Sequence, residues 1–168
     1  MIRDILRHTG NFFFFVLLQV LILNKIEISG FINPYLYVLF ILLLPFETPK
    51  WFLLVVAFLL GLSIDLFSDT LGMHTFATVL LAFIRPYLLS VIAPRDGYEK
   101  GTSPGVKSFG MEWFLKYSLI LVFAHHFALF YIETFSFHMF FSTLLRVILS
   151  GIFTMVLIVL SQLISLKR

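Results

Sequence analysis

The chain has 168 residues, of which 60% are hydrophobic and only 12% are charged. A soluble domain carries about twice that share of charged residues, so the composition excludes a soluble globule and indicates an integral membrane protein. The net charge of +3 is small. Most basic residues lie near the ends of apolar runs, which is typical of topology signals and not of a nucleic-acid surface. The chain contains no cysteine, which excludes disulfides and thiolate metal sites.

Six apolar runs follow one another along the chain, at residues 9–24, 31–46, 51–67, 71–93, 113–132 and 139–165. A helix needs about 20 residues to cross a bilayer, so these runs predict an all-α, polytopic bundle of six transmembrane helices. The length leaves room for one domain, covering residues 1–168. The second and third runs are slightly short, and a five-span or re-entrant arrangement with its break at 68–72 stays open. Residues 94–112 are expected to form the one substantial loop, on the cytoplasmic side.

Basic residues are unevenly distributed between the ends of these runs. With the N-terminus in the cytoplasm, the external segments hold only Lys25. The cytoplasmic segments then hold Arg3, Arg7, Lys50, Arg95, Lys100, Lys107, Lys116, Lys167 and Arg168. Because Lys and Arg are retained on the cytoplasmic side, both termini are predicted to lie there.

Small and polar residues recur at helical spacing in the last four runs. Residues four apart share a helix face, and in lipid such residues lie against other helices. The stripes are Gly61, Asp65 and Asp69 in the third run, His74, Thr78, Ala82 and Arg85 in the fourth, Ser118, His125 and Ala128 in the fifth, and Ser142, Arg146, Ser150 and Thr154 in the sixth. We expect these four runs to share a buried polar seam, with the first two runs packed outside it.

Asp65 is the most informative residue of this seam, because a charge near hydrocarbon is costly and usually faces a protein partner. At about 1.5 Å per residue, Asp65, Arg146, His125 and His126 lie at similar depths. Arg85 lies nearer the cytoplasmic side, where it can snorkel. These depths favour a buried ion pair between Asp65 and Arg146, with the two histidines as neighbours. A structural pair is favoured over a proton relay.

The patterns that enzymes need are missing or incomplete. The histidines have no carboxylate clustered at metal-ligand spacing. Gly61-Leu62-Ser63 lacks the second glycine of a nucleophile elbow. Asp65 and Asp69 have no Gly-rich or basic phosphate cradle beside them, and there is no P-loop or dinucleotide fingerprint. The sequence therefore favours a protein that is not an enzyme and that holds no cofactor or metal.

Across the third and fourth runs the sequence reads G-L-x-x-D-x(6)-G-x-H, at Gly61, Leu62, Asp65, Gly72 and His74. Together with the six runs and the cytoplasmic N-terminus, this motif resembles the MreD family of bacterial rod shape-determining proteins. The order of spans covers most of the chain, whereas the motif covers about fourteen residues.

The resemblance implies a non-enzymatic scaffold of the cell-elongation complex in the bacterial inner (plasma) membrane. Such a scaffold maintains cell shape and organises peptidoglycan synthesis. Its direct partner would be MreC, and through MreC it would connect to MreB, to RodA and to a penicillin-binding transpeptidase. The motif residues would shape the bundle or a partner-facing groove.

A transport subunit is the alternative. MreD proteins look similar in fold to the substrate-binding components of energy-coupling-factor vitamin transporters, which are also six-span bundles. Those components often carry small residues at regular spacing on the first span. Residues 12–23 here contain no Gly or Ala, and the external loops are short, so the scaffold is favoured.

Overall fold

The computed structural model describes residues 2–26, 31–99, 101–135 and 139–166, with the backbone alone for residues 2–5. The long helices are α1 (Ile2–Leu21), α3 (Lys50–Ser68), α4 (Met73–Val91), α5 (Val106–Thr134) and α6 (Phe140–Leu166), and the short ones are η1 (Leu23–Lys25) and α2 (Val38–Leu42). No β-strand occurs in these ranges. The prediction of an all-α chain is confirmed.

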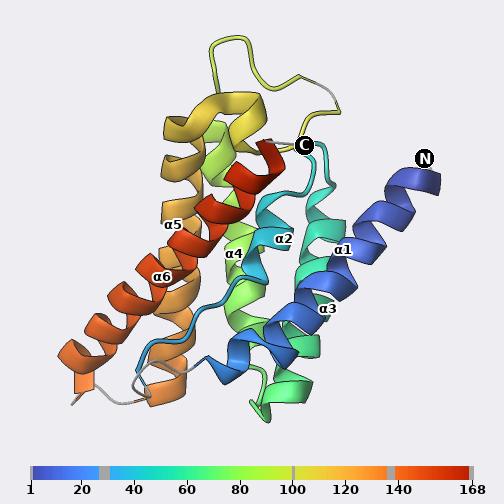
Figure 1. The fold of residues 1–168 in the computed structure, drawn as a ribbon. Coiled ribbons are helices and arrows are strands. Elements are labelled where there is room, and N and C mark those ends of the chain that lie inside the picture. The colour runs from blue at the N-terminus through green and yellow to red at the C-terminus, as the bar shows by residue number, and fades with distance from the viewer. Residues whose placement is uncertain (1, 27–30, 100, 136–138, 167–168) are drawn as a thin grey trace.

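The long helices keep many apolar side chains on their outer surfaces. All five are long and apolar enough to cross a membrane. Phe13, Phe58, Leu66 and Ile152 are each about half exposed or more. Such surface is costly in water and suits a lipid environment. The helices are therefore those of a multi-pass membrane protein. The start of α1 and the end of α6 lie toward the same end of the bundle (Figure 1).

Helices α3, α4, α5 and α6 pack against one another in chain order, whereas α1 packs mainly on α3 at the edge of the bundle. Their bounds follow the apolar runs closely, except near the expected loop at 94–112. There α5 begins at Val106, and Gly110 interrupts it with a φ of 79°. The expected loop was therefore too long, because its last residues form a first helical turn that Gly110 separates from the main helix.

The second apolar run does not form a long helix. Asn24, just beyond α1, donates a hydrogen bond to Ser68 Oγ at the end of α3, at 2.9 Å. The chain must then return along the length of α3 to reach Lys50, where that helix begins. On this path only Val38–Leu42 is α-helical among the described residues. The expected helix at 31–46 is corrected to an extended segment with one short helix.

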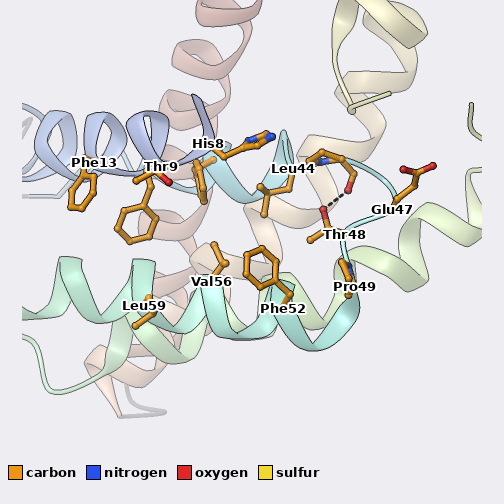
Figure 2. Close-up of a pocket in the computed structure, with 13 residues that line it drawn as sticks. His8, Thr9, Phe13, Leu44, Glu47, Thr48, Pro49, Phe52, Val56 and Leu59 are labelled. Atoms are coloured by element: carbon orange, nitrogen blue, oxygen red, sulfur yellow. Dashed lines mark hydrogen bonds between the residues drawn. The ribbon is translucent and has the colours of Figure 1, made fainter. Parts of the chain in front are cut away.

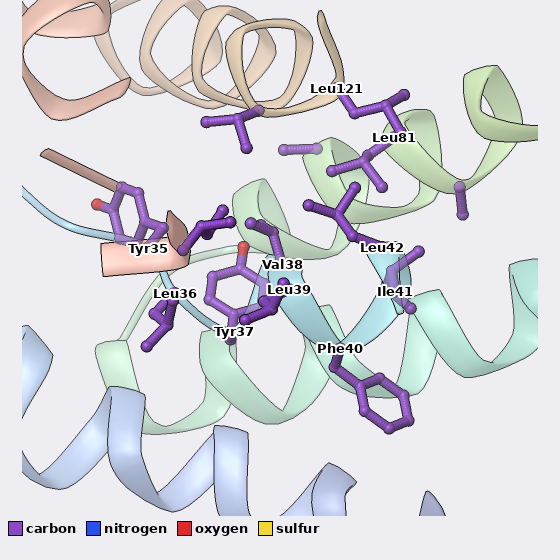
Figure 3. Packing of buried hydrophobic residues seen from close by; sticks show 14 of the residues in the cluster. Tyr35, Leu36, Tyr37, Val38, Leu39, Phe40, Ile41, Leu42, Leu81 and Leu121 are labelled. Atoms are coloured by element: carbon purple, nitrogen blue, oxygen red, sulfur yellow. The ribbon is translucent and has the colours of Figure 1, made fainter. Parts of the chain in front are cut away.

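The middle of this path, residues 33–44, lies at the centre of the bundle, and we call it the central segment. Tyr37, Val38, Ile41 and Leu42 have no exposed surface. Figure 3 shows these side chains enclosed by the neighbouring helices. The expectation that the first two runs pack outside the polar seam is therefore wrong for the second run, whereas α1 lies at the edge of the bundle and contributes Gln19 to the seam.

Side chains of the surrounding helices satisfy the backbone of the central segment. Three backbone N–H groups of this segment donate hydrogen bonds of 3.0 to 3.4 Å to side chains. The Asn33 N–H donates to Ser150 Oγ, the Tyr35 N–H to Thr154 Oγ1, and the Tyr37 N–H to Gln19 Oε1. Three of its carbonyl groups accept hydrogen bonds. The Pro34 carbonyl accepts from Gln19 Nε2, the Leu42 carbonyl from Tyr117 Oη, and the Leu44 carbonyl from the Arg85 guanidinium. Non-helical backbone is tolerated at membrane depth only where protein partners satisfy it. The polar seam thus supports the central segment.

Candidate functional site

The Asp65 carboxylate lies where α3 ends and α4 begins. Its Oδ1 accepts hydrogen bonds from Thr70 Oγ1 at 2.5 Å and from the His74 backbone N–H at 3.0 Å. Its Oδ2 accepts from the Thr75 backbone N–H at 2.8 Å and from the Thr75 hydroxyl at 2.6 Å. Only 3% of the residue is exposed. All four hydrogen bonds therefore join residues of one helical hairpin.

Asp65 supplies the cap that α4 lacks at its own start. The residue before α4 is Gly72, which has no side chain and whose φ of 83° suits glycine. The first N–H groups of a helix have no partner within the helix, and negative charge is favoured beside them. The carboxylate from α3 satisfies two of these donors. The spacing of Asp65, Gly72 and His74 in the motif therefore allows a carboxylate of α3 to cap the start of α4 across the turn.

Gly61 allows α3 and α4 to approach closely. A Cβ added to Gly61 would lie 2.8 Å from the His74 carbonyl oxygen and 2.8 Å from the Thr75 nitrogen. These are backbone atoms, which cannot turn aside as a flexible side chain can. Leu62, the next motif residue, is half-buried beside this contact. Four of the five motif residues therefore build the turn and contact between α3 and α4.

Replacing Gly61 with Ala is expected to lower the free energy of unfolding by about 2 kcal/mol, because overpacking forces the backbones apart. Unfolding can be followed by titrating the protein from mild into denaturing detergent. Gly10→Ala is the control, since a Cβ there meets nothing within 4 Å. Equal stability of the two variants would contradict the close approach of the helices.

Tyr37 and two histidines form a buried cluster beside this turn. The Tyr37 hydroxyl lies 3.1 Å from His74 Nδ1, 2.7 Å from His125 Nε2 and 3.2 Å from Thr78 Oγ1. A hydroxyl has one proton to donate, so it can donate to only one of the two histidines and must accept from the other. The remaining nitrogen of His125, Nδ1, is buried and has no hydrogen-bond partner. The cluster links the central segment to α4 and α5.

The expected ion pair between Asp65 and Arg146 is wrong. Asp65 is fully engaged in the hairpin, and Arg146 Nη1 bonds to Glu133 Oε1 at 2.9 Å. The Arg146 guanidinium also lies 4.3 Å from the centre of the Phe130 ring. Equal depth in two helices does not bring two side chains together when they point to different neighbours. Glu133 lies closer to Arg146 because it belongs to the preceding helix.

The other seam residues are buried but have partners that were not expected. Arg85 is 1% exposed and does not snorkel, because Tyr117 Oη and the Leu44 carbonyl accept its hydrogen bonds. His126 does not flank an ion pair. Its Nδ1 bonds to the Val122 carbonyl at 2.8 Å, and its Nε2 lies 3.1 Å from Thr154 Oγ1. His125 and His126 thus contact the central segment and α6, respectively.

Sequence reasoning missed three residues that complete these contacts. Gln19 is fully buried, although it lies within an otherwise apolar stretch of the first run. Tyr37, in the second run, and Glu133, just beyond the fifth, lie outside the predicted stripes of small and polar residues. A polar residue such as Gln19 inside an apolar run is the signal that could have revealed a buried non-helical neighbour, because such a side chain needs a hydrogen-bond partner.

Two hollows adjoin this framework. The first, which we call the lateral groove, has a volume of about 520 Å³ and lies between α1 and α3 (Figure 2). Phe13, Phe52, Val56 and Leu59 line it, and Glu47 lies at one end. The second, which we call the polar cavity, has a volume of about 300 Å³. It lies at the end of the bundle where α3 turns into α4, and residues from η1, α3, α4, α5, α6 and the central segment line its wall or mouth.

No group of three or more His, Asp or Glu residues that could hold a metal occurs in the described parts of the chain. No protein-family model, curated protein or solved structure matches this chain. A function must therefore be inferred from the motif and from the geometry of the α3–α4 hairpin and its two adjoining hollows.

Proposed function

We propose that this protein is a non-enzymatic membrane scaffold of the MreD type, which binds MreC and so organises peptidoglycan synthesis during cell elongation. In this proposal the central segment provides the sixth crossing of the bacterial plasma membrane, and both termini lie in the cytoplasm. MreB, RodA and a penicillin-binding transpeptidase are reached indirectly through MreC.

The proposal rests on the structural roles of two motif residues, Asp65 and Gly61. Asp65 accepts four hydrogen bonds, all from residues that form or follow the α3–α4 turn. Gly61 brings the backbones of the two helices together. A carboxylate with both oxygens occupied is suited to fixing geometry and poorly suited to accepting a proton from a substrate. This supports a rigid bundle that presents its surface to partners.

The lateral groove is the surface that best suits a partner helix. Val56 and Leu59 of α3 face α1 across it (Figure 2), and its lining is almost wholly apolar. Glu47 at its end is exposed and has no ion pair with any described residue. In the proposed orientation Glu47 lies on the cytoplasmic side. Single-span proteins carry Lys or Arg just inside that boundary, so a basic residue flanking the MreC helix can pair with Glu47.

Depletion of the protein in its native bacterium tests the function. We expect rods to become rounded and swollen, because the elongation machinery loses its membrane scaffold. Cells of normal shape would refute the proposal, and normal shape with loss of vitamin uptake would instead support a transport subunit.

Capture of MreC from detergent-solubilised membranes tests the groove. Val56→Trp fills the groove with a larger side chain and is expected to reduce capture of MreC at least tenfold. A loss of about 1.4 kcal/mol in binding free energy is enough to lower the affinity tenfold. Val55→Trp is the matched control, because Val55 is on the same helix, is 48% exposed and does not line the groove. If both variants capture MreC as the wild type does, the groove is not the binding surface.

A further inference from the structure

The polar cavity is unusual for a bundle with so apolar a surface. Its wall carries the hydrogen-bonding side chains of Asn24, Asn33, Ser68, His74, Glu133 and Arg146. A polar cavity of this size in a membrane protein holds water or a polar ligand, because its side chains otherwise lose their partners. Intramembrane ionisable residues that line a cavity also mark functional sites by default.

His74 offers this cavity an unused nitrogen. The residue is only 4% exposed and lines the cavity. Its Nδ1 is engaged with the Tyr37 hydroxyl, whereas its Nε2 makes no hydrogen bond with any described residue. Because His74 lines the cavity, this nitrogen is available to form a hydrogen bond with a polar group in the cavity.

Arg146 and Glu133 define the charge that this occupant must carry. They form an ion pair at 2.9 Å, and their side chains are 20% and 38% exposed. Among the described residues that line the cavity, the charges of this pair therefore cancel, and a ligand with a single charge would draw one partner away and leave the other unpaired. A zwitterion avoids this cost. Its acidic oxygens can bind the Arg146 guanidinium, which suits phosphate and carboxylate groups, while its amine donates to Glu133.

We propose that the polar cavity binds a small zwitterion that combines an acidic oxygen group with a protonated primary amine. The phosphoethanolamine headgroup of a lipid and a free molecule of the same chemistry both meet this description. Phe67, which also lines the cavity, is 65% exposed and gives its mouth an apolar edge. The site is separate from the lateral groove, so it can fail without affecting the proposed scaffold function.

Thermal unfolding of the purified full-length protein tests the site with three probes. These are short-chain phosphatidylethanolamine, phosphatidylcholine with the same chains, and free phosphoethanolamine. A ligand that binds only the folded protein raises Tm with its concentration. The primary amine should bind about tenfold more tightly than the quaternary amine, because the latter cannot donate a hydrogen bond to Glu133. Equal effects of the lipid and of free phosphoethanolamine would identify a soluble zwitterion as the ligand, and a stronger effect of the lipid would identify a headgroup.

Glu133→Gln should abolish the preference for the primary amine. Glu112→Gln is the matched control, because it breaks an exposed pair with Lys116 far from the cavity and should keep the preference. The proposal is overturned if none of the three probes raises Tm, or if the two lipids act equally on the wild type. It is also overturned if Glu133→Gln retains the preference. The comparison of lipids on the wild type decides the matter even if that variant does not fold.

Discussion

Replacing Asp65 with Asn is expected to lower the free energy of unfolding by about 3 kcal/mol, although the two side chains have nearly the same shape. An amide keeps one acceptor oxygen and turns the other position into a donor. Whichever way it is oriented, its NH₂ faces either the His74 N–H or the Thr75 N–H. At least one backbone donor of α4 is then buried without a partner. Titration into denaturing detergent, followed by tryptophan fluorescence, measures the loss.

Asp69→Asn is the control for this prediction. Asp69 lies in the same turn, is exposed and has a φ of 51°, which Asn tolerates as well as Asp does. It is expected to change the free energy of unfolding by no more than about 0.5 kcal/mol. If Asp65→Asn proved as harmless as this control, the carboxylate would not be the cap of α4.

The spacing of polar residues allowed much of the candidate site to be predicted. Asp65, His74, His125 and Arg85 are all buried, because a residue that recurs every three or four positions in an apolar helix must face another helix. Their partners could not be predicted in the same way. Periodicity gives the face of a helix but does not specify which atom lies opposite. Asp65 bonds to the turn only five to ten residues further along the chain, and local partners such as these compete successfully with distant charges.

The path of the central segment could not be obtained from hydropathy. A short apolar stretch buried by protein on all sides has the same composition as a stretch exposed to lipid. Pro34 and Pro45 restrict helix formation near the two ends of the second run, and they are consistent with the observed break in helical structure. The decisive features are the side chains that satisfy its backbone, such as Gln19 from the preceding long helix and Thr154, which lies 119 residues from Tyr35 in the sequence.

Tyr37→Phe is expected to lower the free energy of unfolding by about 3 kcal/mol, because the missing hydroxyl leaves two buried ring nitrogens without partners. His125 is affected most. Its Nδ1 already lacks a partner, and its Nε2 forms a hydrogen bond of 2.7 Å with the Tyr37 hydroxyl. His74 Nδ1 loses its partner at the same time. The packing of the ring is unchanged, so the loss measures the polar contacts of the cluster.

Tyr87→Phe provides the comparison, since it removes the same hydroxyl from a side chain that is 53% exposed on α4. We expect that variant to stay within about 0.5 kcal/mol of the wild type in the same detergent titration. Equal losses for the two tyrosines would mean that the Tyr37 hydroxyl does not hold the central segment against α4 and α5. A loss confined to Tyr37→Phe would establish that the shared Tyr37 hydroxyl helps to hold the central segment against α4 and α5, beside the hydrogen bonds to its backbone. The two histidines would then be coupled, because a change of donor role at one requires the opposite change at the other.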